Sequence, residues 1–237
     1  MNHLLDKNRK KVNLKFILFL FVMLCQTDFL NAQQSKFGNW FIYFGNQKIN
    51  KKWNWWNEVQ VRNYDFVEDV QQVLMRTGIG YDLVENNLNV LVGYAHVASY
   101  NYQSNSAEKI VSTEHRIYQQ LNIKNRFNRI FLTHRYRAEE RFFKDDFKFR
   151  FRYFLSCNIP ITKSDMIENT LYASFYNEVF LQTKSPFFDR NRAYIALGYV
   201  INPKLKMEMG YMAQTLEKTS RNQFQIVFFN SIPFYKE

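Results

Sequence analysis

Charged residues occupy alternate positions inside several segments of this 237-residue chain. In the stretch 129–143, Arg135, Arg137, Glu139 and Arg141 stand at every second position. Residues two apart on a β-strand share one face, so these groups can pair with one another or bind a charged ligand. The same parity in neighbouring segments defines a predicted charge network of Glu58, Arg62, Arg135, Arg137, Glu139, Arg141, Arg150, Arg152, Glu168, Glu178 and Arg192.

A hydrolytic site would need a nucleophile, a base and an orienting group within reach of one another. His96, His115 and His134 all fall in segments with strand character, on the side with apolar neighbours. The residues next to them in sequence point to the opposite face, so adjacent residues form no dyad. A dyad between residues on two neighbouring strands remains possible, but we expect isolated histidines at the membrane interface and no catalytic residue.

Metal and cofactor sites are not predicted either. The three histidines and Cys157 show no ligand spacing. The chain has no glycine-rich phosphate loop, and Gly78 and Gly80 lie within an alternating segment. There they are expected to let a sheet curve or to leave room for bulky side chains. We therefore expect no metal and no cofactor.

The elements that carry these residues read as β-strands. Polar and apolar residues alternate in segments of about ten residues, the signature of transmembrane strands. In 147–159 aromatic and aliphatic residues fill one face, while Lys148, Arg150 and Arg152 share the other. Short connections such as 85–87 alternate with longer ones such as 101–112, as in outer-membrane barrels. This pattern favours a transmembrane barrel over a soluble β-sandwich, which would also alternate.

The strand count conflicts with the parity of known barrels. Eleven segments read as strands, whereas single-chain bacterial barrels have even strand numbers. We therefore expect ten or twelve strands and regard 38–45, the shortest segment, as the one that is counted wrongly. Trp40, Trp53, Trp55 and Trp56 suit an interfacial girdle at strand ends. The predicted strands are eleven, namely 38–45, 52–64, 71–83, 87–100, 113–123, 129–143, 147–159, 166–179, 191–201, 205–214 and 221–232.

The first 32 residues are predicted to be a cleaved signal peptide. A basic segment precedes the apolar run FILFLFVMLC, and Ala32 supplies a small residue before the expected cleavage site. The apolar run is too short for a membrane-spanning helix, which needs about 20 residues. Residues 33–237 then form one barrel domain with Cys157 as its single cysteine, so no internal disulfide can form. The net charge of +11 would suit nucleic acid, but export favours anionic lipid instead.

Several stretches together resemble an uncharacterised outer-membrane barrel family, domain of unknown function 2490. The strongest are THRYRAEERF at 133–142 and YNEVF at 176–180. FGNWFIYF, KKWNWWNEVQVRNYD and DRNRAYIALGYVINPKLKMEMGY extend the resemblance over most of the chain. The resemblance implies an outer-membrane barrel and no particular activity.

These observations predict an all-β, single antiparallel transmembrane barrel of about 10–12 strands in a Gram-negative outer membrane. A charge facing lipid at mid-bilayer costs about 2–4 kcal/mol, so the charge network should face the lumen and form Arg–Glu pairs there. Such pairs would mostly occlude the lumen, or would line a narrow, porin-like, anion-preferring pore. The expected partners are outer-membrane lipid, lipopolysaccharide and the barrel-assembly machinery, with no nucleic acid and a monomeric state. A lipid-modifying acyl hydrolase and a soluble periplasmic β-sandwich are the alternatives.

Overall fold

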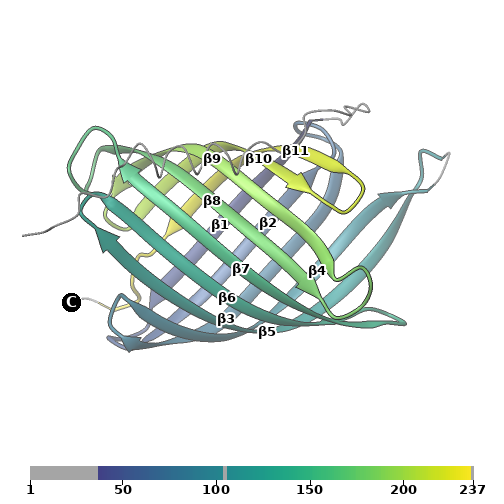
Figure 1. Cartoon of the computed structure of the whole chain (residues 1–237), viewed down its shortest axis with the longest axis horizontal. Coiled ribbons are helices and arrows are strands. Elements are labelled where there is room, and N and C mark those ends of the chain that lie inside the picture. Colours follow the sequence, from purple (N-terminus) through teal and green to yellow (C-terminus); the bar gives the residue numbers. More distant parts are fainter. Residues whose placement is uncertain (1–36, 104–105, 236–237) are drawn as a thin grey trace, which may run out of the picture. The chain divides into compact units, whose positions relative to one another are not determined.

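A computed structural model describes residues 37–103 and 106–235, so the predicted signal peptide lies outside the described residues. The described chain is folded entirely into strands and their connections (Figure 1). The strands are β1 (Gly38–Lys48), β2 (Trp53–Asn63), β3 (Val70–Val84), β4 (Leu88–Tyr102), β5 (Lys109–Phe127), β6 (Ile130–Phe142), β7 (Phe147–Pro160), β8 (Thr170–Gln182), β9 (Phe188–Asn202), β10 (Leu205–Thr215) and β11 (Ser220–Asn230).

The strands close into one barrel, which confirms the predicted all-β barrel fold and excludes the β-sandwich fold. Each strand pairs antiparallel with its neighbours in the chain, and β1 closes the barrel by pairing parallel with β11. This parallel register runs from Gly38 opposite Gln223 to Gly45 opposite Asn230. Closure leaves no unpaired sheet edge on which other chains could add.

The expectation of an even strand number was wrong. Residues 37–103 and 106–235 contain eleven strands, and the segment thought to be miscounted is a full strand that extends to Lys48. An odd number of up-and-down strands can close only if the first and last strands run parallel. The chain consequently enters the barrel at one rim and leaves it at the other. The first residue of β1 lies at the rim where β2 ends, and the last residue of β11 lies at the rim where β10 begins.

The connections define the two rims. We call the rim with connections 49–52, 85–87, 128–129, 161–169 and 203–204 the turn end, and the rim with 64–69, 103–108, 143–146, 183–187 and 216–219 the loop end. Asn86, Asn128 and Asn169 at the turn end have φ near +60°, at 59°, 55° and 59°. Asparagine tolerates this left-handed conformation better than most residues, which permits tight reversals.

The expected contrast between short and long connections is weaker in the structure. β5 already begins at Lys109, which shortens the predicted loop 101–112 to 103–108. β8 begins only at Thr170, so 161–169 is the longest connection and belongs to the turn end. A strand can continue into polar residues where the neighbouring strand provides backbone hydrogen-bond partners. The alternation of polar and apolar residues in the sequence does not reveal where those partners end.

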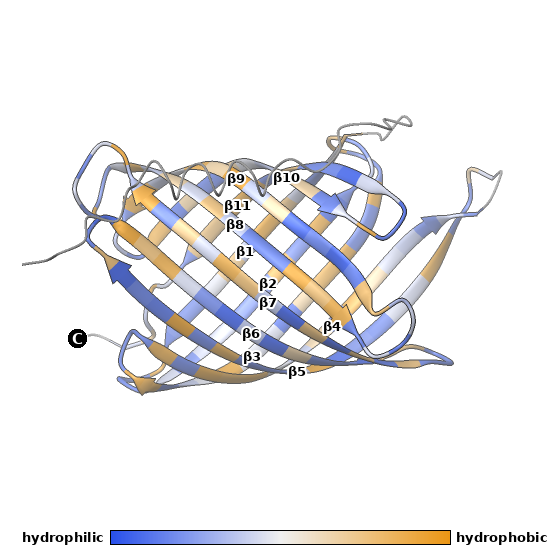
Figure 2. Cartoon of the chain, in the orientation of Figure 1, coloured by the Kyte–Doolittle hydropathy of each residue, from blue (hydrophilic) through white to orange (hydrophobic). Residues whose placement is uncertain are grey.

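The two faces of the sheet have opposite character, visible as alternating colours along the strands in Figure 2. Outward-facing Phe151, Ile195 and Leu197 are more than half exposed, at 53%, 54% and 55%. Among the described residues, 25 polar or charged side chains are buried against 14 apolar ones. The barrel is thus polar inside and apolar outside, the reverse of a water-soluble domain.

Glycines inside the strands make room for large neighbours. The ring of Tyr172 lies over Gly198 on the next strand, where a Cβ would stand 2.2 Å from it. Gly80 similarly accommodates the side chain of Asn54, which lies opposite on β2. Glycine at these strand positions permits a close approach that any other residue would block.

Across residues 37–103 and 106–235, no helix has the length and apolar character to span a bilayer.

Candidate functional site: the charged interior

The interior holds a cavity of about 840 Å³. Its wall reaches from Asn86 and Lys204 at the turn end to Phe143 in a loop-end connection. Among the described residues, the lining includes nine arginines and four lysines but only five carboxylates. The basic side chains are Arg62, Arg76, Arg116, Arg135, Arg141, Arg150, Arg152, Arg190, Arg192, Lys48, Lys124, Lys204 and Lys206.

Glu139 lies at the centre of the ion pairs and is 0% exposed. Arg150 donates through Nε to Glu139 Oε2 at 3.0 Å, and Arg152 donates through Nη1 to Oε1 at 2.6 Å. A third guanidinium, that of Arg137, lies 3.5 Å from Oε1. The alternation of β6 and the opposite pairing of Glu139 with Arg150 bring these groups together. A carboxylate without water is tolerated here because both oxygens have cationic partners.

Glu178 on β8 continues this network across the wall. Its Oε1 accepts hydrogen bonds from Arg152 at 2.6 Å and from Arg135 at 2.8 Å. Arg192 approaches the other oxygen, Oε2, at 3.8 Å. Arg152 therefore bridges two carboxylates on two strands, and each carboxylate is shared by more than one guanidinium.

Two further carboxylates, Glu114 and Glu58, are also buried beside arginines. Glu114 on β5 accepts Arg116 Nε at 2.6 Å and Arg141 Nη2 at 3.0 Å, so one carboxylate serves two arginines. Glu58 is buried beside Arg76 on the neighbouring strand. Sharing carboxylates in this way satisfies hydrogen bonds but leaves the interior with excess positive charge.

Arg62 carries the least compensated charge of the network. Its Nε and Nη2 donate to Gln60 at 3.1 and 2.6 Å, and its Nη1 donates to Gln72 at 2.6 Å. Among the described residues, no carboxylate lies within ion-pair distance of this guanidinium. Its Cζ lies 3.9 Å from the ring centre of Trp40, and Arg192 lies 4.8 Å from the same ring. Two guanidiniums thus contact one indole ring by cation–π interaction.

An apolar cluster interrupts the charged interior surface on β1, β9, β10 and β11. The expected tryptophan girdle is wrong for two of its members, because Trp40 is only 4% exposed and Trp56 lines the cavity. Parity explains both positions, since even-numbered residues of β1 and β2 face inward. The apolar cluster consists of Trp40, Ile42, Tyr194, Ala196, Met212 and Val227, with Phe44, Tyr176 and Phe229 packed against it.

The structure places ten of the eleven residues of the predicted charge network in the interior. Glu168 does not join them. It lies exposed in the connection before β8, because the strand begins two residues later than residue 168. The prediction omitted charged interior residues that β-strand parity could have revealed, among them Arg76, Glu114 and Arg116. Asp189, which pairs with Arg150 and Arg190, could not be found by parity, because it directly precedes the inward-facing Arg190 at a register shift between β8 and β9.

The outer face carries a histidine pair that corrects the expectation of isolated histidines. His96 and His115 are opposite each other on β4 and β5, with ring centres 5.1 Å apart. The Tyr94 hydroxyl hydrogen-bonds His115 Nδ1, and His134 contacts the Tyr153 hydroxyl at 2.9 Å. Sequence parity placed each ring on this face but carried no information about which strands pair. Among the described residues, no group of three metal-ligating side chains is assembled.

At the loop end, Asp146 lies exposed in the connection 143–146. A hydrogen bond from the Lys184 ammonium and another from the backbone N–H of Phe147 hold the pKa of Asp146 below its ordinary value. Solvent screens this pair, so its contribution to stability is small.

Comparison with known proteins assigns the family. The family model described as "Protein of unknown function (DUF2490)" matches residues 37–225, which is nearly the whole barrel. An uncharacterised protein of Methylorubrum extorquens is 29% identical over 167 residues, covering 67% of this chain and 69% of that protein. No solved structure matches the chain significantly. Since the family model covers far more than half of the sequence, the chain belongs to the DUF2490 family of proteins of unknown function.

Proposed function

We propose that this protein is an outer-membrane barrel whose lumen, mostly occupied by its own ion pairs, leaves a narrow path that prefers anions. The observation that carries this proposal is the imbalance of the cavity wall, with thirteen basic against five acidic side chains. Rings of Arg and Lys favour anions in pores, because a confined, low-dielectric wall strengthens the field of each charge.

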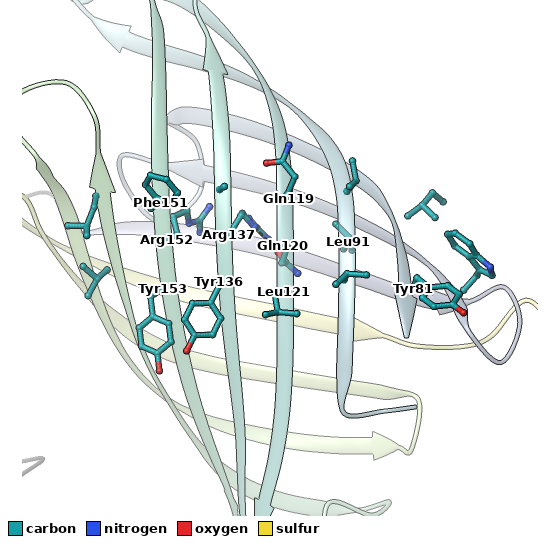
Figure 3. A pocket seen from close by; sticks show the side chains of 17 residues that line it. Tyr81, Leu91, Gln119, Gln120, Leu121, Tyr136, Arg137, Phe151, Arg152 and Tyr153 are labelled. Atoms are coloured by element: carbon teal, nitrogen blue, oxygen red, sulfur yellow. Dashed lines mark hydrogen bonds between the residues drawn. The ribbon is translucent and has the colours of Figure 1, made fainter. Parts of the chain in front are cut away.

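The outer surface supports a location in lipid. A hollow of about 810 Å³ lies against strands β2 to β8, and its outward-facing lining is almost entirely apolar. Figure 3 shows Tyr136 and Tyr153 on neighbouring strands beside Leu121, with Phe151 close by. Apolar surface of this extent is unfavourable in water and favourable against acyl chains. Glu140 is an acidic residue on the outer face. It lies two residues from the end of β6, where a membrane interface would be.

The proposed surroundings follow from this location. Outer-membrane lipid and lipopolysaccharide would cover the outer face, and the barrel-assembly machinery would insert the chain. A closed sheet has no free edge for pairing with a second copy, which supports a monomer. The proposed pore uses no catalytic group and no cofactor.

Ion selectivity tests the proposed pore. With the purified barrel in a planar bilayer between unequal KCl solutions, we expect discrete conductance steps. The reversal potential should take the sign of the chloride equilibrium potential, because the excess arginines attract chloride and repel potassium. A reversal potential of the opposite sign would contradict the proposal.

Gel migration supplies the control for folding. A closed transmembrane barrel extracted only by detergent should migrate differently before and after boiling. Release of the protein without detergent, with no boiling-dependent shift, would argue against a membrane barrel. Lipid hydrolysis that disappears in the His115→Ala variant would instead support the acyl hydrolase alternative.

A further inference from the structure

Two arginines of the interior, Arg62 and Arg192, lie where the charge network borders the apolar cluster. Arg62 uses three of the five N–H groups of a guanidinium, all toward neutral glutamine oxygens. Arg192 donates through Nε to the neutral oxygen of Gln214 at 2.9 Å, and among the described residues its one carboxylate neighbour, Glu178, lies 3.8 Å away. Both arginines line the cavity, and each guanidinium has N–H groups beyond those that bond the glutamines.

The indole ring of Trp40 contacts both arginines. Its ring centre lies 3.9 Å from Arg62 Cζ and 4.8 Å from Arg192 Cζ, and Trp40 also lines the cavity. A cation–π contact leaves the N–H groups in the plane of a guanidinium able to donate to a ligand. Two such guanidiniums at the cavity wall favour an oxygen-bearing anion as the ligand.

The apolar residues next to these arginines indicate what the rest of the ligand should be. Ile42 and Phe44 follow Trp40 along the inner face of β1, and Val227 and Phe229 lie on the paired face of β11. Ile42 and Val227 belong to the same buried cluster as Trp40, and Phe44 stacks on Phe229 with ring centres 5.4 Å apart. A small hydrated anion would leave this apolar strip unused, whereas a ring or short hydrocarbon body would bury against it.

We propose that Arg62, Arg192 and Trp40 form a binding subsite for organic acids, with a carboxylate bound by the guanidiniums and an aromatic or alicyclic body along the apolar strip of β1 and β11. The subsite rests on the proposed function only in that the ligand enters from the lumen. Bidentate pairing of a guanidinium with a planar carboxylate provides the orientation, and the apolar strip provides selectivity over inorganic anions.

Calorimetry on the detergent-solubilised full barrel tests the subsite with four probes: benzoate, acetate, inorganic phosphate and benzyl alcohol. Benzoate should bind, acetate and phosphate should bind at least about tenfold more weakly, and neutral benzyl alcohol should not bind. Acetate or phosphate binding as tightly as benzoate would overturn the role of the apolar strip, and no benzoate binding would overturn the subsite.

Matched variants test the residues. Arg62→Gln and Arg192→Gln should each raise the dissociation constant of benzoate about tenfold or more, because each removes a charged hydrogen-bond donor. Trp40→Phe keeps an aromatic ring beside the two guanidiniums and should weaken binding less. Arg126→Gln, which changes an exposed arginine paired with Asp165 outside the cavity lining, should leave binding unchanged. Equal effects of Arg62→Gln and Arg126→Gln would refute the assignment.

The outcomes separate the subsite from the pore. A boiling-dependent gel shift for each variant shows that the barrel is intact and that lost binding is local. Benzoate binding without bilayer conductance would support the subsite and refute the pore. Anion-selective conductance without benzoate binding would support the pore and refute the subsite.

Discussion

Replacing Glu139 with glutamine is expected to lower the free energy of unfolding by about 3–5 kcal/mol, the usual effect of breaking a buried ion pair from one side. Glu139 is fully buried and accepts hydrogen bonds from Arg150 and Arg152, with Arg137 nearby. Glutamine retains the size of the side chain but removes the charge, so Arg137 loses its carboxylate neighbour, while Arg150 and Arg152 keep only Asp189 and Glu178. Denaturant unfolding in detergent, followed by the boiling-dependent gel shift, measures the loss.

The adjacent residue provides the control. Glu140 lies on the outer face of the same strand and makes one long hydrogen bond, with Gln119 at 3.4 Å. Glu140→Gln is the identical chemical change one position away, and we expect no loss of stability because no buried cation depends on this carboxylate. Equal losses in the two variants would show that the interior ion pairs are not what stabilises β6 and β7.

Placing an arginine on the outer face at mid-strand should be similarly disruptive, provided that this face contacts lipid. Ile195 is midway along β9, is 54% exposed and lies opposite Tyr211 and Phe175. For Ile195→Arg we expect a loss of about 2–4 kcal/mol in unfolding from lipid vesicles, the cost of an arginine near the bilayer midplane. In water the same change at so exposed a site would be nearly neutral.

The same substitution in a connection is the matched control. Ile167 is 49% exposed in the connection 161–169 at the turn end, outside every strand. Ile167→Arg should change the unfolding free energy by no more than about 0.5 kcal/mol. If Ile195→Arg is equally harmless, the outer face does not lie in lipid and the proposed location fails.

Much of the fold could be predicted from alternation alone. A side-chain period of two assigns every residue of a strand to one of two faces, and this assignment placed Arg137, Glu139 and Arg152 together on the inner side. The failures occurred where parity says nothing. Glu168 was assigned to a strand that begins only at Thr170, and Trp40 was judged by residue type although its even position on β1 directs it inward.

Strand pairing is the information that local sequence lacks. His96 and His115 are nineteen positions apart, and only the register of β4 with β5 makes them neighbours. The parallel closure of β1 on β11 likewise depends on the whole sheet, since an odd number of up-and-down strands closes only if the first and last strands run parallel. General experience with even-numbered barrels therefore led to the wrong total, although the eleven segments predicted one by one correspond to the eleven strands of the described residues.

The sequence by itself determined that the chain forms strands with one charged and one apolar face, because the two-residue period of a strand is a local property. Only the tertiary structure decided how the charges are shared. Register, closure and side-chain reach placed Glu139 and Glu178 among several arginines, and left Arg62 and Arg192 around Trp40 without a close carboxylate. The physical reason is that ion pairing acts between strands through space, across distances in sequence that no local pattern encodes.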